Sequence, residues 1–168
     1  MSIDWNELYR STFPDLVRFL HRKVWDADRA RDLAQEAFVR ALEHEPRQPR
    51  AWLFRVAANL ARDEARTVIR RKKHLVLLKA ETDSQDRPEN PEGELEKKEQ
   101  WAEVKAALDA LSEKDREVLL LWDAGMAYPE IADQLGLAVG AVGTTLARAR
   151  RRLVEAYREK EEENVAHR

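Results

Sequence analysis

The arginines of this 168-residue chain recur at helical spacing in two stretches, which are the residues best suited to bind a charged partner. One stretch follows a predicted helix-turn-helix over residues 128–153. Pro129 suits the first position of its first helix, and Gly136 stands where a left-handed residue ends that helix. The second helix, from Val139, presents hydroxyl groups and then guanidinium groups on one face: Thr144, Thr145, Arg148, Arg151 and Arg152. Such a face is typical of a helix in the DNA major groove. A plain helical hairpin with a solvated basic face is the alternative, and the short connection at Gly136 argues against it.

The second stretch lies on a long helix that is predicted to begin at Pro49 and to reach at least Arg66. Its core face is expected to hold Leu53, Val56, Ala57, Leu60 and Ala61. Its other flank carries basic residues with an asparagine among them and an aromatic ring at the start: Trp52, Arg55, Asn59, Arg62, Arg66 and Arg70. This pattern predicts a groove for nucleic acid with unstacked bases. The alternative is a solvated cationic helix in which Asp63 and Glu64 pair with the arginines.

Further helices must position these surfaces. Asp4 and Glu7 form a predicted capping box for the first helix, and Pro14 predicts a break near Thr12 or Phe13. The helix over residues 28–43 has a core face of apolar residues at three- and four-residue steps: Ala30, Leu33, Ala34, Ala37, Phe38, Ala41 and Leu42. Its outer face is polar with one apolar residue set into it: Asp32, Gln35, Glu36, Val39 and Arg40. A solvent-exposed helix surface without a binding function accounts for this face equally well.

The chain is predicted to fold as two small helical domains, so the fold class is all-α. Residues 79–96 are rich in acidic residues, with prolines and a glycine, and predict a flexible acidic linker. It separates a domain over 1–78 from one over 97–160, with a frayed tail over 161–168. In the second domain Ser112 and Asp115 form a predicted capping box, and the helix that follows has Val118, Leu119, Leu121 and Trp122 as its apolar residues and Gly125 at its end.

Composition excludes several classes of function. The chain has no cysteine and four scattered histidines, so neither a disulfide nor a zinc site is expected. We find no nucleophile paired with a base and no glycine-rich phosphate loop, and we expect no enzyme, catalytic residue, metal or cofactor. No apolar run approaches the ~20 residues of a membrane span, and no signal peptide is evident, so a cytoplasmic location is expected. The net charge of −2 does not oppose DNA binding, because the distribution of charge matters more than its sum.

Four stretches resemble, in order, the motifs of the extracytoplasmic-function (ECF) group of bacterial sigma factors. DLAQEAFVRA, from Asp32, is similar to the D-x-x-Q-x-x-F motif of region two. PRAWLFRVAANLARDEAR, from Pro49, is similar to the W-L-x-x-x-A-x-N-x-x-x-D-x-x-R helix. LSEKDREVLLL, from Leu111, looks like the opening of region four, and residues 128–153 resemble its helix-turn-helix. With the acidic linker, the resemblance covers nearly the whole chain.

The resemblance implies a dissociable subunit of RNA polymerase that brings the core enzyme to promoters and helps to open them. It implies that the polymerase clamp docks on the helix that carries Asp32, Gln35, Glu36, Phe38, Val39 and Arg40. Phe38 also falls on the predicted core stripe, so we expect it to serve chiefly as packing. It places Asn59, Asp63, Arg62, Arg66 and Arg70 near the minus-ten element, with the loop over 44–50 taking up an unstacked base. Thr144, Thr145, Arg148 and Arg151 would face the minus-thirty-five element. Core RNA polymerase, promoter DNA and a cognate anti-sigma factor are the partners implied.

The recognition helix departs from the family pattern. Gly143 and Thr145 stand where a lysine or arginine is common, so base readout is expected to differ here. Gly140 and Gly143 each cost about 0.5–1 kcal/mol of helix stability relative to alanine, and Ala127 and Ala138 replace the usual serine caps. Two other classes therefore stay open: a dimeric helix-turn-helix regulator that binds an operator, and a sigma-like adaptor that binds proteins.

Overall fold

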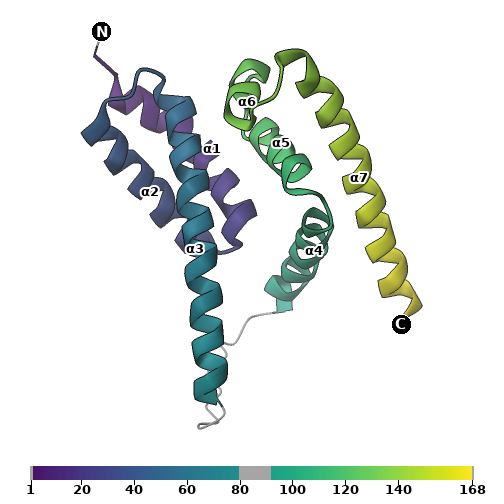
Figure 1. The fold of residues 1–168 in the computed structure, drawn as a ribbon. Coiled ribbons are helices and arrows are strands. Elements are labelled where there is room, and N and C mark those ends of the chain that lie inside the picture. Colours follow the sequence, from purple (N-terminus) through teal and green to yellow (C-terminus); the bar gives the residue numbers. More distant parts are fainter. Residues whose placement is uncertain (1, 80–91, 168) are drawn as a thin grey trace. The chain divides into compact units, whose positions relative to one another are not determined.

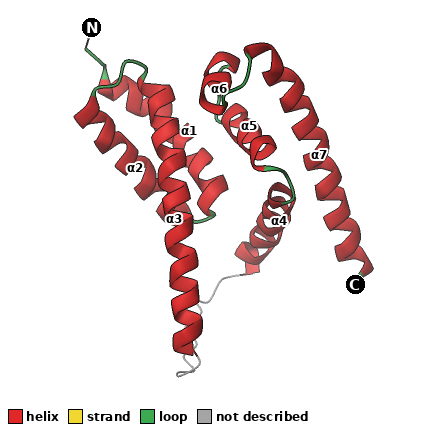
Figure 2. Ribbon diagram, viewed as in Figure 1, coloured by secondary structure: helices red, strands yellow, loops and turns green. Residues whose placement is uncertain are grey.

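The computed structural model describes residues 2–79 and 92–167, and their side chains except those of 68, 72–79 and 92–100. Within these residues the chain forms seven helices and no strand (Figures 1 and 2), which confirms the predicted all-α class. The chain divides into two compact units, residues 1–86 and 87–168. Most of the predicted linker, residues 80–91, lies outside the described residues. None of the helices described is long and apolar enough to cross a bilayer.

The first unit consists of three helices that pack against one another, α1 (Trp5–Val24), α2 (Ala27–His44) and α3 (Pro49–Lys79). Its core is built from large apolar side chains of all three helices: Leu16, Phe19, Leu20, Leu33, Phe38, Leu53 and Phe54. The Phe19 and Phe54 rings meet edge to face, with centroids 5.3 Å apart. The C-terminal part of α3 continues past α1 and α2 (Figure 1), so the packed half of α3 is the half that begins at Pro49.

Helix α1 begins as predicted but does not break. The Asp4 carboxylate accepts a hydrogen bond from the backbone N–H of Glu7 at 3.1 Å, which satisfies one of the free donors of the first turn. The predicted interruption near Thr12 or Phe13 is wrong, because the helix runs through Pro14 to Val24. Pro14 and Arg10, whose carbonyl loses its helical donor, are both exposed, so water can satisfy that carbonyl.

The second unit contains α4 (Glu92–Asp109), α5 (Glu113–Asp123), α6 (Tyr128–Leu135) and α7 (Val139–Ala166). Helix α7 packs against the other three, and its buried residues Val142 and Leu146 share a core with Val118, Leu121 and Ile131. Two boundaries differ from the prediction. Helix α4 begins within the stretch 79–96 that was predicted as linker, and α7 continues to Ala166 through the tail that was predicted to fray.

Two glycines end the helices on either side of the predicted turn. Gly125 and Gly136 have φ angles of +87° and +68°, a region that costs residues with a Cβ atom about 1–2 kcal/mol. After each glycine the chain closes back on the helix: the N–H of Met126 donates to Leu121 O at 3.1 Å, and the N–H of Leu137 donates to Ala132 O at 2.9 Å. These are the hydrogen bonds of Schellman caps. The predicted helix ends at Gly125 and Gly136 are therefore confirmed.

Two residues predicted on apolar core faces are in fact exposed. Leu42 is 53% exposed, because it lies at the edge of the stripe formed by Ala34, Phe38 and Ala41. Trp122 is 42% exposed, and the guanidinium of Arg150 covers its ring at 3.9 Å from the centroid. A cation over an indole face keeps much of the ring out of water, so this position suits an aromatic residue without belonging to the core.

Candidate nucleic-acid interface

Helix α7 buries one stripe and exposes the opposite face. Val142, Leu146 and Ala149 are buried as predicted, while Thr144 and the arginines at 148, 151 and 152 are exposed. Thr145 corrects the prediction, since it is only 6% exposed. It lies three residues after Val142 and four before Ala149, which places it on the core stripe. Thr145 therefore packs in the core and cannot reach a base edge.

A buried carboxylate joins α5 to the arginines of α7. Asp115 is 1% exposed, and its Oδ2 accepts a hydrogen bond from Arg152 Nη1 at 2.6 Å. Arg148 Nη2 lies 3.8 Å from Oδ1 of the same carboxylate. The predicted capping box is only half formed: Ser112 Oγ accepts from the N–H of Asp115 at 3.2 Å, whereas the Asp115 side chain turns to α7. Sequence reasoning missed this contact, because the two partners are 37 residues apart.

The predicted basic flank of α3 is exposed to solvent along its length. Its members Arg55, Asn59, Arg62, Arg66 and Arg70 are all exposed, and so is Asp63 beside them. Trp52, at the start of the flank, is half-buried and lies beside His44, with the two ring centroids 5.6 Å apart. His44 Nδ1 is 2.8 Å from the carbonyl oxygen of Arg40, which fixes the ring at the end of α2. Sequence reasoning missed this aromatic pair, although His44 opens the loop singled out for an unstacked base.

Glu64 does not neutralise the basic flank, because another helix holds it. Arg29 on α2 donates to both of its carboxylate oxygens, from Nε at 2.8 Å and from Nη2 at 2.7 Å. This bidentate bond holds the pKa of Glu64 below its ordinary value, and it raises the pKa of Arg29. Among the described residues neither Asp63 nor Glu64 forms an ion pair with Arg62 or Arg66. The arrangement therefore favours a cationic surface over a self-neutralised one.

The outer face of α2 combines charges with an apolar patch. Asp32, Gln35, Glu36, Val39 and Arg40 are all exposed, as predicted. Arg40 Nε and Glu36 Oε1 pair at 3.1 Å, and Arg29 Nη1 lies 3.5 Å from Asp32. Val39 is 51% exposed and lies three residues before the exposed Leu42, so the two share one side of the helix. Sequence analysis recognised Val39 alone, since Leu42 was assigned to the core.

Aromatic rings continue the exposed apolar surface onto α1. Tyr9 is 42% exposed and stacks on Phe13 with the centroids 4.6 Å apart. The Tyr9 ring also meets Phe38 edge to face at 5.1 Å. Phe38 itself is buried, which confirms its predicted role in packing. The first unit thus exposes apolar and aromatic side chains of α1 and α2 in addition to its surface ion pairs.

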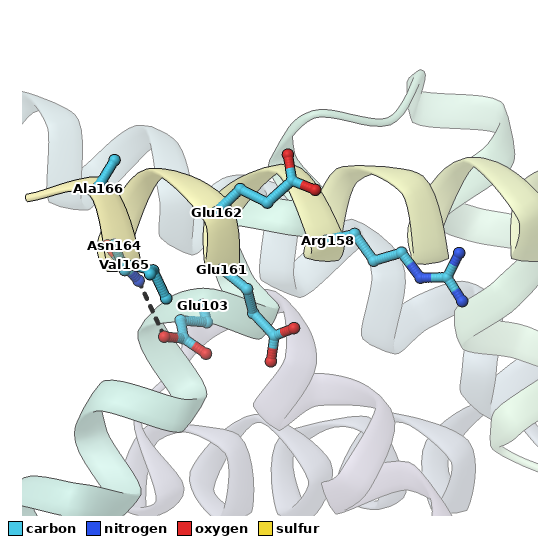
Figure 3. Close-up of a pocket in the computed structure, with 7 residues that line it drawn as sticks. All are labelled: Glu103, Arg158, Glu161, Glu162, Asn164, Val165 and Ala166. Atoms are coloured by element: carbon cyan, nitrogen blue, oxygen red, sulfur yellow. Dashed lines mark hydrogen bonds between the residues drawn. The ribbon is translucent and has the colours of Figure 1, made fainter.

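A groove lies between α4 and the C-terminal half of α7 in the second unit. Its apolar part encloses about 290 Å³ and is lined mainly by Val104, Ala107, Leu153, Val154 and Tyr157. Beyond it, Figure 3 shows Glu103 of α4 beneath the side chains of α7. Glu103 accepts hydrogen bonds from Tyr157 Oη at 3.3 Å and from Asn164 Nδ2 at 2.9 Å, which hold α7 in place past Leu153. No group of side chains in the described part of the chain is arranged to hold a metal ion.

Comparison with known proteins assigns both units. Residues 8–71 match the family model for sigma-70 region 2, and residues 101–153 match the model for sigma-70 region 4. The basic flank of α3 lies in the first match, and the helix-turn-helix in the second. The class defined by the two units is that of sigma factors built on regions two and four.

The relatives narrow the class to one family. The chain is 35% identical to ECF RNA polymerase sigma factor EcfG of Rhodopseudomonas palustris, over 83% of this chain and 77% of that protein. It is 30% identical to ECF RNA polymerase sigma factor SigE of Mycolicibacterium smegmatis, over 89% of this chain but only 60% of that longer protein. A solved structure of CnrH in complex with the cytosolic domain of CnrY is similar with a TM-score of 0.62 and 25% identity, over 90% of this chain and 85% of CnrH. The chain belongs to the ECF RNA polymerase sigma factors.

Proposed function

We propose that this chain binds core RNA polymerase in the cytoplasm and directs it to promoters, with α3 at the minus-ten element and α7 at the minus-thirty-five element. The observation that carries the proposal is the exposed basic flank of α3, whose acidic neighbour Glu64 is held by Arg29. Among the described residues Arg62 and Arg66 form no ion pair with the carboxylates of their own helix, so these two guanidinium groups are available to a polyanion.

The length of the basic flank supports its assignment to the minus-ten element. From Arg55 to Arg70 the helix rises about 22 Å at 1.5 Å per residue, and all of the flank's residues described along it are exposed. At 3.4 Å per nucleotide along one strand, this length corresponds to roughly six or seven bases. Trp52 and His44 present aromatic rings at one end, where an unstacked base would find a stacking partner.

Helix α7 supports a contact with duplex DNA in the major groove. Thr144 is an exposed hydroxyl, and Arg148 and Arg151 follow one and two turns later on the exposed side. Thr144 is thus suited to base edges, and the arginines to phosphates. Arg152 keeps a place in this surface, although one edge of its guanidinium is bound to Asp115. Thr145 has no part in the contact, because it is buried.

The outer face of α2 is the surface we assign to core polymerase. Asp32, Gln35, Glu36 and Arg40 supply polar groups around Val39, and Leu42 and Tyr9 extend the apolar area. Exposed apolar residues surrounded by charges are typical of a protein interface. We also expect a protein partner, the anti-sigma factor that the family resemblance implies, and in the solved relative CnrH the cytosolic domain of CnrY is such a protein partner.

Run-off transcription with purified core polymerase tests the proposal. The templates are fragments from upstream of the gene for this chain, and the variants are Arg62→Ala/Arg66→Ala and Arg148→Ala/Arg151→Ala. Arg10→Ala/Arg18→Ala is the matched control, because it removes two exposed arginines from α1. We expect specific transcripts from wild type and control, and at least tenfold less from either DNA-surface variant, since each lost charge-assisted contact costs about 1–3 kcal/mol.

Two other outcomes would replace the proposal. Wild-type protein that binds core polymerase but yields no specific transcript would favour the sigma-like adaptor, with the α4–α7 groove as its protein-binding surface. Tight, sequence-specific binding of duplex DNA by the chain without polymerase would favour the operator-binding regulator.

A further inference from the structure

Asp115 is the most deeply buried charged side chain described, and its partners belong to the proposed DNA surface. The residue is 1% exposed, whereas the side chains of Arg152 and Arg148 are 52% and 47% exposed. The carboxylate thus lies inside the protein and the two guanidiniums lie at its edge. A buried carboxylate requires charged or hydrogen-bonding partners, and here the recognition helix supplies them.

The geometry restricts how the two arginines can point. Arg148 and Arg152 are one helical turn apart on α7, and both reach back to the same carboxylate at the first turn of α5. The 2.6 Å bond from Arg152 Nη1 is short, as expected for a charge-assisted hydrogen bond. A guanidinium has five N–H donors in a fixed fork, so a bond along one edge leaves the other edge free and directed outward.

Asp115, the residue that both arginines contact, is itself held in place. Ser112 Oγ accepts a hydrogen bond from the N–H of Asp115, and the side chain of Asp115 sits in the first turn of α5. Nearby Val118 and Leu121 anchor α5 in the core. The carboxylate is therefore a rigid reference point for two long side chains that would otherwise sample many rotamers.

We propose that Asp115 is a positioning residue for promoter recognition, which holds Arg148 and Arg152 in the orientation that contacts phosphates of the minus-thirty-five element. This inference rests on the proposed DNA-binding role of α7. Asp115 lowers the net positive charge of the surface, so it opposes general attraction to DNA. Asp115 contributes by fixing the positions of the N–H donors of Arg148 and Arg152 that it does not bind itself. Fixed donors match the phosphate positions of the correct promoter sequence better than those of any other duplex.

The test compares binding of the reconstituted holoenzyme to a promoter fragment and to the same fragment with a scrambled minus-thirty-five element. The variant is Asp115→Asn, and the matched control is Asp109→Asn, which removes an exposed carboxylate that pairs with Arg116 of α5 at 3.6 Å. We expect Asp115→Asn to lower affinity for the promoter about tenfold, within the range for groups coupled in one ion-pair network. Affinity for the scrambled fragment should stay the same or rise, because the substitution removes one negative charge beside the arginines.

A cycle with the arginines separates positioning from a structural role. In an Arg148→Gln/Arg152→Gln background, Asp115→Asn should cause no further loss of the ratio between promoter and scrambled binding. A loss of equal size in that background, or an equal fall in binding to both fragments, would overturn the inference. Wild-type holoenzyme that does not distinguish the two fragments would instead contradict the proposed function of α7.

A second variant keeps the test decisive if Asp115→Asn does not fold. Residue 152 lies at the edge of the protein, and Arg152→Lys retains its positive charge. An ammonium group, however, lacks the two edges with which a planar guanidinium can bind Asp115 and a phosphate at the same time. We expect the ratio between promoter and scrambled binding to fall while the salt dependence of binding is unchanged. An unchanged ratio would overturn the inference.

Discussion

Gly140 offers a prediction in which stability and function change in opposite directions. The residue lies in the first turn of α7, and its φ is not in the left-handed region. A Cβ atom at this position would meet nothing within 4 Å apart from its chain neighbours and the backbone of its own helix. Neither backbone conformation nor packing within the protein therefore calls for glycine here. Gly140 lies one turn before Thr144 on the exposed face, where the proposed DNA contact requires the helix backbone to approach the base edges.

The expected size of the stability gain follows from this position. Alanine is more favourable than glycine in a helix by about 0.5–1 kcal/mol, and the lower end applies in the first turn. A gain of about 0.5 kcal/mol corresponds to an increase of about 2–4 °C in the Tm of a domain of this size. An added methyl group between α7 and DNA should weaken promoter binding by about 1 kcal/mol or more, which is roughly fivefold.

The assay pairs a thermal melt of Gly140→Ala with run-off transcription by its holoenzyme. Gly143→Ala is the matched control, because its Cβ atom would lie 3.6 Å from the Tyr128 ring, an ordinary contact within the protein. We expect both variants to melt at higher temperature and only Gly140→Ala to lose transcription. If Gly140→Ala is more stable and transcribes as well as wild type or better, then DNA does not approach this residue and our placement of α7 is refuted.

Three further predictions concern the first unit. Arg29→Ala should reduce run-off transcription severalfold, because it frees the Glu64 carboxylate beside the basic flank. Adding Glu64→Gln to the same chain should restore transcription. If it does not, the Arg29–Glu64 pair only stabilises the packing of α2 on α3. Burial, and then the charge of Arg22, lowers the pKa of His21. The contribution of His21 to stability is therefore complete above about pH 6.5, and it is lost as the pH falls through the folded-state pKa. In urea melts His21→Gln should reduce this loss of unfolding free energy at acid pH, and an unchanged dependence of that free energy on pH would contradict the prediction. Pro14→Ala should raise the free energy of unfolding by roughly 1–3 kcal/mol, because the Arg10 carbonyl regains a helical donor, and a lower urea midpoint would show that proline stabilises α1 in another way.

The sequence was sufficient to predict which residues of a helix are buried, because the buried face of a helix repeats every three or four residues. The stripe of Val142, Leu146 and Ala149 is one example, and the stop at Gly136 is another, since few other residues adopt a positive φ cheaply. The exposed flank of α3 follows from the same period. These features depend on residues within one or two turns of each other.

Features that depend on long-range contacts were not predictable. Nothing near Glu64 in the sequence indicates that Arg29 takes its carboxylate, because the partners are 35 residues apart. The Ser112–Asp115 pattern correctly predicted a cap but gave the wrong role to the Asp115 side chain, whose charge pairs with α7. Thr145 was assigned to the DNA surface because of its hydroxyl group, although its spacing from Val142 places it in the core.

The Schellman caps at Gly125 and Gly136 have a consequence for how this surface can evolve. They fix where α6 starts and stops and how the chain enters α7, and the buried stripe of α7 fixes its rotation about its own axis. Gly140 and Thr144, on the outward face of α7, take no part in either constraint. If α7 contacts DNA as we propose, substitutions at these two positions can change the preferred DNA sequence without refolding the domain, whereas substitutions of Arg148 or Arg152 also disturb the buried Asp115. Promoter choice could then diverge between related chains that keep the same scaffold.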